Sequence, residues 1–272
     1  MRLLSHKANG QTPKSAGEQS ASGPQDASSR PSSPSSILEE GERHITRTVI
    51  KLSWPSILEQ LLISMATLAD TAMVGSIGAA ATAAVAVNIS TVWLINGFMT
   101  ALSVGCSYLV AHAVGSGSVR RTHSVTYQSI TCAFILGILL FLGVELVCQP
   151  LPIWLGAAPD VVPMAQSYMR VIGFGLLPQS IAVVLSSIFR SAGDTRTPLA
   201  ANLTSNLANI VGNFFLIYSP REMALGGHLI PVWGAGLGVT GAAISTAASQ
   251  YLLALILRFH LSHKDSPVRI PL

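Results

Sequence analysis

Apolar residues occur in long, continuous runs along this chain, beginning near Leu52. Strands of a membrane barrel would alternate polar and apolar residues, whereas an unbroken run of about 20 apolar residues is typical of a membrane-spanning helix. Six runs are long enough, so we predict an all-α fold, a polytopic membrane bundle of about six transmembrane helices. The predicted spans are 49–74, 79–113, 124–148, 161–189, 197–219 and 234–258.

The two ends of the chain have a different composition from these spans. Residues 1–42 are rich in Ser, Pro and Gly and contain no apolar stretch that could bury a core, which predicts a disordered tail. Residues 43–262 hold the six spans and form the expected helical lobe. Residues 263–272 are expected to be its cytoplasmic end.

Charged residues are few and unevenly placed. They make up 10% of the 272 residues, far below the share in a soluble domain, and the net charge is +4. By the positive-inside rule, the basic residues place both termini in the cytoplasm, in a multi-pass protein of the cell membrane. These residues lie at alternate ends of the spans, at Arg43, Arg47, Lys51, Arg120, Arg121, Arg190, Arg196, Arg258, Lys264 and Arg269.

Motifs for other functions are absent from the sequence. It has no GxxxxGK[ST] loop for nucleotide hydrolysis, no HExxH zinc motif and no basic patch interleaved with aromatic residues for nucleic acid. The three cysteines lie in apolar segments and are interpreted as packing residues. We therefore expect no enzyme, no metal site and no cofactor, and energy that comes from an ion gradient.

Asp70 is the acidic residue that stands out. It lies near the end of the first predicted span, and no Asp, Glu, Lys or Arg follows it before Arg120. An ionisable group in hydrocarbon is costly unless it faces a bundle interior or a wet cavity, so such groups mark ion or substrate pathways. We predict that Asp70 binds a proton or a cation. A capping role near Gly75 is the alternative.

Glu59 and Gln60 lie nearer the cytoplasmic end of the same span. We interpret Glu59 as a side chain that reaches the membrane interface, and a cytoplasmic cavity lined by Glu59 and Gln60 is the alternative. Glu145, near the outer end of the third span, receives the same interfacial interpretation.

The fifth predicted span carries four asparagines on one helix face. Asn202, Asn206, Asn209 and Asn213 are spaced at four, three and four residues. Such a row either lines a polar cavity or hydrogen-bonds to neighbouring helices, and both alternatives stay open. Pro178 is expected to kink the fourth span, and we count it with Asn202 and Asn206 among the candidate cavity-lining residues.

Several segments resemble a known transporter family. The most specific is the loop Arg-x-x-Gly-Asp-x-Arg-x-Pro, which begins at Arg190. In order and spacing, residues 48–262 resemble the N-terminal six-helix lobe of the multidrug and toxic compound extrusion (MATE) transporters. The matching segments are Trp54–Pro55, Asp70–Gly78, Val110–Gly117, Phe189–Pro198, Asn209–Asn213 and Gly238–Thr246.

The resemblance implies antiport coupled to H⁺ or Na⁺, which exports organic cations or drugs by alternating access. In the archaeal-type branch, the ion site of this lobe has an Asp on the first helix, an Asn and an Asp on the fifth, and a Thr on the sixth. The resemblance gives these roles to Asp70, Asn209, Asn213 and Thr246. Asn213 departs from the pattern because that branch has a second Asp there, so a two-carboxylate site is not implied.

The family has twelve helices in two lobes, and the resemblance covers one lobe. We expect a truncated or split gene product whose partner is a second lobe, a split-gene chain or an identical copy, besides drug substrate and membrane lipid. Two other functions stay open. One is a lipid-linked saccharide flippase of the same superfamily, which would be expected to show more basic residues in the cavity than Arg170 alone. The other is an inactive or assembly-only membrane subunit.

Overall fold

The computed structural model describes residues 34–225 and 228–262, and the chain divides into two units, Met1–Thr46 and Arg47–Leu272. The described part of the first unit is helical and belongs to α1 (Pro34–Gly75). Helix α1 thus begins before residue 42, where the predicted tail ends. Residues 1–33 and 263–272 lie outside the described residues, so the disordered tail and the cytoplasmic end stay predictions.

The other helices follow the predicted spans closely. Five described helices are long and apolar enough to cross a membrane. They are α1, counted from Ser53, together with α2, α3, α5 and α7. Helix α6 matches the predicted span 197–219, but its row of asparagines makes it more polar than those five. The predicted all-α membrane bundle is confirmed. The bounds are α2 (Ala79–Gly115), α3 (Val119–Val147), α4 (Leu151–Trp154), α5 (Val162–Ser191), α6 (Arg196–Leu216) and α7 (Gly238–Ser262).

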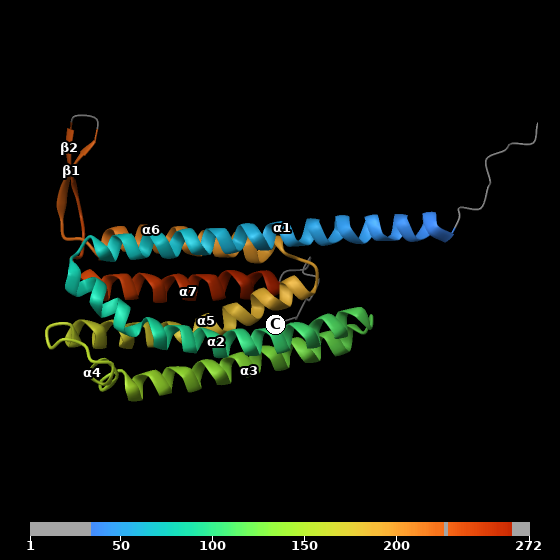
Figure 1. Ribbon diagram of the computed structural model, residues 1–272, viewed down its shortest axis with the longest axis horizontal. Helices are drawn as coiled ribbons and strands as arrows, with labels where there is room; N and C mark the ends of the chain where they lie inside the picture. The colour runs from blue at the N-terminus through green and yellow to red at the C-terminus, as the bar shows by residue number, and fades with distance from the viewer. Residues whose placement is uncertain (1–33, 226–227, 263–272) are drawn as a thin grey trace, which may run out of the picture. The chain divides into compact units, whose positions relative to one another are not determined.

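A short antiparallel hairpin between α6 and α7 is absent from the sequence prediction. Strand β1 (Arg221–Leu225) pairs with β2 (His228–Val232). The hairpin lies at one end of the bundle, and the α2–α3 and α5–α6 loops lie at the other (Figure 1). The basic residues that flank those two loops therefore share one end, as the charge pattern predicts. Which side of the membrane that end faces stays a prediction.

Helix α5 is the central helix of the bundle. It packs against α2, α3 and α7, and Figure 1 shows it between α7 and the other two. A Cβ atom at Gly175 would lie 3.2 Å from the Cα of Ala247, so the backbones of α5 and α7 are in close contact. The helix continues through Pro178, which is buried. Pro178 is therefore a core residue of α5.

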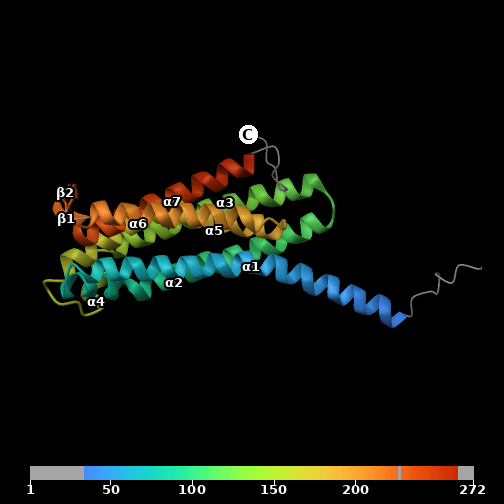
Figure 2. The ribbon, with the colours of Figure 1, turned by 90° about the horizontal axis from the view of Figure 1, so that it is seen from above.

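Helix α1 runs beside α6 and presents a narrow face to the bundle (Figures 1 and 2). Glu59, Ala66 and Val74 share that face, because they recur about every seven residues, and all three are buried. Leu61 and Leu68 on the other faces are 56% and 70% exposed, as suits contact with lipid tails. Few residues therefore attach α1, and polar ones are prominent among them.

The loop between α5 and α6 explains the most specific sequence segment. Gly193 has a φ of +88°, a left-handed conformation that favours glycine. Asp194 Oδ1 then accepts hydrogen bonds from the backbone N–H groups of Arg196 at 3.1 Å and Thr197 at 3.0 Å. These bonds satisfy donors at the start of α6. The turn thereby fixes Arg190, at the end of α5, relative to the first turns of α6.

Candidate functional site

The asparagine face of α6 meets both α1 and α7. Asn202, Asn209 and Asn213 are buried, and Asn206 is half-buried. Each of the three buried amides hydrogen-bonds to a side chain of another helix. The predicted face is confirmed, and interhelical hydrogen bonding is one of its roles. Asn202 also lines a cavity, so the two alternatives are combined at that residue.

Asp70, on α1, lies against this face near the C-terminal end of α6. The Nδ2 group of Asn213 donates to Asp70 Oδ1. Asn213 is fully buried, and among the described residues its Oδ1 atom has no hydrogen-bond partner. A buried acceptor without a partner is uncommon in proteins. This unpaired oxygen belongs to the same Asn213 amide whose nitrogen donates to the Asp70 carboxylate.

Asn209 links Asp70 to Thr246 of α7. The orientation of its amide is assigned from its neighbours, and the nitrogen fits toward the carboxylate. In that orientation it donates to Asp70 Oδ1 at 2.7 Å, while its oxygen accepts from Thr246 Oγ1 at 3.3 Å and Thr246 N at 3.2 Å. Ser245 Oγ also donates to the Asn209 carbonyl at 2.8 Å. The four residues that the family resemblance singles out are therefore brought together.

The Asp70 cluster is composed of one carboxylate, two amides and one hydroxyl. In the described part of the chain, no Lys, Arg or His forms an ion pair with Asp70. A carboxylate in this setting is stabilised by amide N–H groups but its charge is not neutralised. Its oxygens are suited to a proton or a hard cation, because such cations prefer oxygen ligands.

A second polar cluster lies on the same face of α1, at Glu59. Arg190 Nη1 donates to both carboxylate oxygens, at 3.0 and 3.2 Å, and Asn202 Nδ2 donates to Oε1 at 2.8 Å. The Glu59 side chain is only 7% exposed. The interfacial interpretation of Glu59 is therefore wrong, because burial is made tolerable by a guanidinium from α5.

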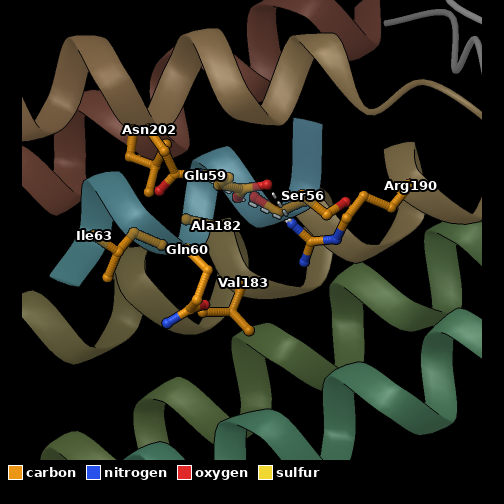
Figure 3. A pocket seen from close by; sticks show the side chains of 10 residues that line it. Ser56, Glu59, Gln60, Ile63, Ala182, Val183, Arg190 and Asn202 are labelled. Carbon is orange, nitrogen blue, oxygen red and sulfur yellow. Dashed lines mark hydrogen bonds and ion pairs between the residues drawn. The ribbon is translucent and has the colours of Figure 1, made fainter. Parts of the chain in front are cut away.

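A cavity opens beside this second cluster, with a volume of about 260 Å³. Figure 3 shows Gln60, Val183 and the guanidinium of Arg190 around it, together with Glu59 and Asn202. Glu59 and Gln60 both line this cavity, as the alternative expectation has it, and whether the cavity is on the cytoplasmic side stays a prediction. Its walls come from four helices, and its lining residues are Ser56, Glu59, Gln60, Ile63, Ala182, Val183, Ser186, Arg190, Asn202 and Leu253.

Other predicted residues lie elsewhere. Asn206 and Pro178 do not line this cavity, and the Nδ2 atom of Asn206 has no partner among the described residues. Glu145 pairs with Arg170 at 3.8 Å, and the two side chains are 28% and 50% exposed. Arg190 is the site residue that the sequence analysis missed, because Arg190 served there only to orient the spans and to mark the start of the family loop. The available signal was Glu59 itself, an acid in an apolar run that needs a cation.

Comparison with known proteins places this arrangement in a family. The model of the MatE family matches residues 55–215, which include Asp70, Asn209 and Asn213. The chain belongs to the MatE family. The MATE assignment made from the sequence segments is thereby confirmed, and the chain is a multi-pass membrane protein of a transporter family, not an enzyme.

Individual relatives support the same conclusion. The probable multidrug resistance protein NorM of Thermotoga maritima is 30% identical over 84% of this chain and 47% of its own length. NorM of Synechocystis is 28% identical over 80% of this chain and 45% of its own length. A solved structure of a MOP superfamily transporter from Pyrococcus furiosus, described as having a reversed polarity of its binding pocket, superimposes with a TM-score of 0.73 at 26% identity. The match covers 83% of this chain and 47% of that one.

This MATE chain therefore spans about half the length of the curated relatives it matches. The part of this chain that matches them includes α1 and α6, which carry the acid and the amides of the Asp70 cluster.

Proposed function

We propose that this chain is one six-helix lobe of a cation-coupled antiporter that exports organic cations or drugs by alternating access. Asp70 is its ion-coupling carboxylate, and Asn209, Asn213 and Thr246 support it. The coupling ion is H⁺ or Na⁺. A second lobe, a split-gene chain or a second copy completes the substrate cavity, because repeat transporters place that cavity between their halves.

The observation that carries the proposal is the unbalanced charge of Asp70. Two amides hold its carboxylate, and within the described residues no basic side chain neutralises it. The bare acceptor on Asn213 offers a further oxygen at the same place. A membrane potential contributes about 2.3 kcal/mol per charge per 100 mV, which a single exchanging carboxylate can use.

The attachment of α1 fits a helix that changes position. Its inward face joins α6 through hydrogen bonds at Glu59 and Asp70, while most of its large apolar side chains face outward. If ion binding at Asp70 replaces the bonds from the amides, it changes how strongly α1 is held. That is the differential interaction that a two-state transporter needs.

The test is efflux of ethidium from membrane vesicles that contain the chain, driven by an imposed pH or Na⁺ gradient. We expect Asp70→Asn to abolish gradient-driven efflux, because the amide carries no exchangeable charge. Asp160→Asn is the matched control, since Asp160 is exposed and lies between helices α4 and α5. Its efflux should equal that of the natural sequence.

Three results are informative, and the first and the last would overturn parts of this proposal. Equal gradient-driven efflux with and without Asp70→Asn would remove the coupling role of the carboxylate. No efflux from the natural sequence alone, together with efflux when a six-helix second lobe is co-expressed, would show that the chain needs that partner. No efflux under either condition would contradict export of organic cations.

A further inference from the structure

Arg190 is held in a fixed orientation by buried groups. Its Nη1 atom donates to both oxygens of Glu59, and Glu59 Oε1 is held in turn by Asn202. Glu59 and Asn202 are 6% and 9% exposed, so this support is inside the bundle. A guanidinium that is oriented in advance loses little side-chain freedom when it binds a ligand.

The other edge of the same guanidinium is free. Among the described residues, Nε and Nη2 of Arg190 make no hydrogen bond, and the side chain is 33% exposed. Parallel N–H groups on such an edge match the two oxygens of a carboxylate or phosphate. Glu59 instead already accepts three hydrogen bonds and is nearly covered. Glu59 also lines the cavity, but its oxygens are already engaged, so the unpaired donors of Arg190 are the groups that a ligand oxyanion can bind.

The cavity next to that edge has the form of a binding pocket. Its volume of about 260 Å³ is close to the lower end of the usual range for small ligands. Ile63, Val183 and Leu253 supply apolar walls, and Gln60 and Ser186 add polar groups. Figure 3 shows the guanidinium and the Gln60 amide on the border of the same space. This composition suits a molecule with an oxyanion and an apolar body.

We propose that this cavity binds an amphipathic oxyanion, a carboxylate or phosphate, at the Nε/Nη2 edge of Arg190. The apolar body of the ligand lies against Ile63, Val183 and Leu253. The site is separate from Asp70, which lies about 16 Å further along α1 by the helical rise. It goes beyond the proposed ion-coupled export, because it adds a ligand class that the Asp70 cluster does not take.

The test is a titration of 2-naphthoate against the purified full chain in phosphatidylcholine nanodiscs, with empty nanodiscs as the blank. Arg190→Lys keeps a cation for Glu59 but removes the free edge. We expect it to weaken binding at least about tenfold, since an ammonium cannot replace a bidentate guanidinium. Arg170→Lys, at the other ion pair, is the matched control and should bind as the natural sequence does.

A second variant tests the cavity without changing charge. Val183→Phe should fill the apolar part and also weaken naphthoate binding at least about tenfold, because an overfilled pocket excludes the ligand body. Its thermal unfolding in detergent shows whether the bundle is intact. Unchanged binding in Arg190→Lys or in a folded Val183→Phe, or no saturable binding by the natural sequence, would overturn the proposal.

The source of the oxyanion is distinguished by the lipid. If the site takes a lipid headgroup phosphate, phosphatidylglycerol in the nanodiscs should compete with naphthoate and lower its affinity for the natural sequence. The naphthoate affinity of Arg190→Lys should then not change. Equal affinity in both lipids identifies a free amphiphile as the ligand. Asp70→Asn should leave naphthoate binding unchanged, so failure at this site and failure of the ion-coupling role are separable.

Discussion

The two acids on the inner face of α1 lie in different surroundings. Glu59 is buried, and its charge is balanced by Arg190, with Asn202 as a further donor. Asp70 is held by Asn213 and Asn209, two neutral amides, and within the described residues it has no ion-pair partner. The same type of residue on the same helix face is thus a fixed structural charge at Glu59 and a candidate exchangeable charge at Asp70.

The comparison shows that an acid in a membrane helix is informative only with its neighbours. A salt bridge removes the need for an external cation, whereas amides leave that need in place. The partners of Glu59 and Asp70 come from α5 and α6, more than a hundred positions further along the chain.

Removing Arg190 should have the largest effect on stability. Arg190→Ala leaves Glu59 as a buried charge without a counter-ion, and we expect the free energy of unfolding to fall by about 3–5 kcal/mol. Denaturant unfolding in detergent, followed by far-UV circular dichroism, measures this change. The double variant Arg190→Ala with Glu59→Gln should regain most of the loss. Equal stability of the single and double variants would show that charge balance does not decide the effect.

Removing an amide from Asp70 should have a smaller effect. Asn213→Ala removes a donor from the carboxylate, and we expect a loss of about 1–3 kcal/mol in the same assay. Asn206→Ala is the matched control, because the Asn206 amide nitrogen has no partner within the described residues. Its stability should stay close to that of the natural sequence. A larger loss for Asn206→Ala than for Asn213→Ala would contradict the assignment of the Asp70 cluster.

The exposed ion pair should matter least. Glu145→Gln breaks a 3.8 Å contact to Arg170, whose side chain is half exposed. Partly exposed pairs contribute about 0–1 kcal/mol, so we expect a change within that range. Unfolding at low and at raised salt gives the measurement. A loss as large as that of Arg190→Ala would show that burial does not separate the two ion pairs.

The sequence predicts the helical spans well, because each is a continuous apolar run bounded by Gly, Pro or basic residues. It also predicts the asparagine face, since spacing alone puts residues 202, 206, 209 and 213 on one side of a helix. The hairpin at Arg221–Val232 was missed because two five-residue strands carry little pattern of their own.

The surroundings of Glu59 were not predictable in the same way. Arg190 is 131 positions away in sequence, and only the position of α1 beside α5 and α6 in the folded chain brings the two together. A hydropathy pattern treats Glu59 and Asp70 alike, since it carries no information on which side chain of another helix lies next to each acid. The family segments identified Asp70, whereas the Arg190 cavity belongs to none of the matching segments except at its rim, where Phe189–Pro198 begins.

Proton exchange on ligand binding tests the assignment of Asp70 most directly. Tetraphenylphosphonium, an organic cation, would be mixed with the purified chain in weakly buffered nanodiscs, and released protons would be followed with a pH-sensitive dye. The natural sequence and Glu59→Gln should both release protons, and Asp70→Asn should release none. Undiminished release from Asp70→Asn, or its loss in Glu59→Gln alone, would contradict the account.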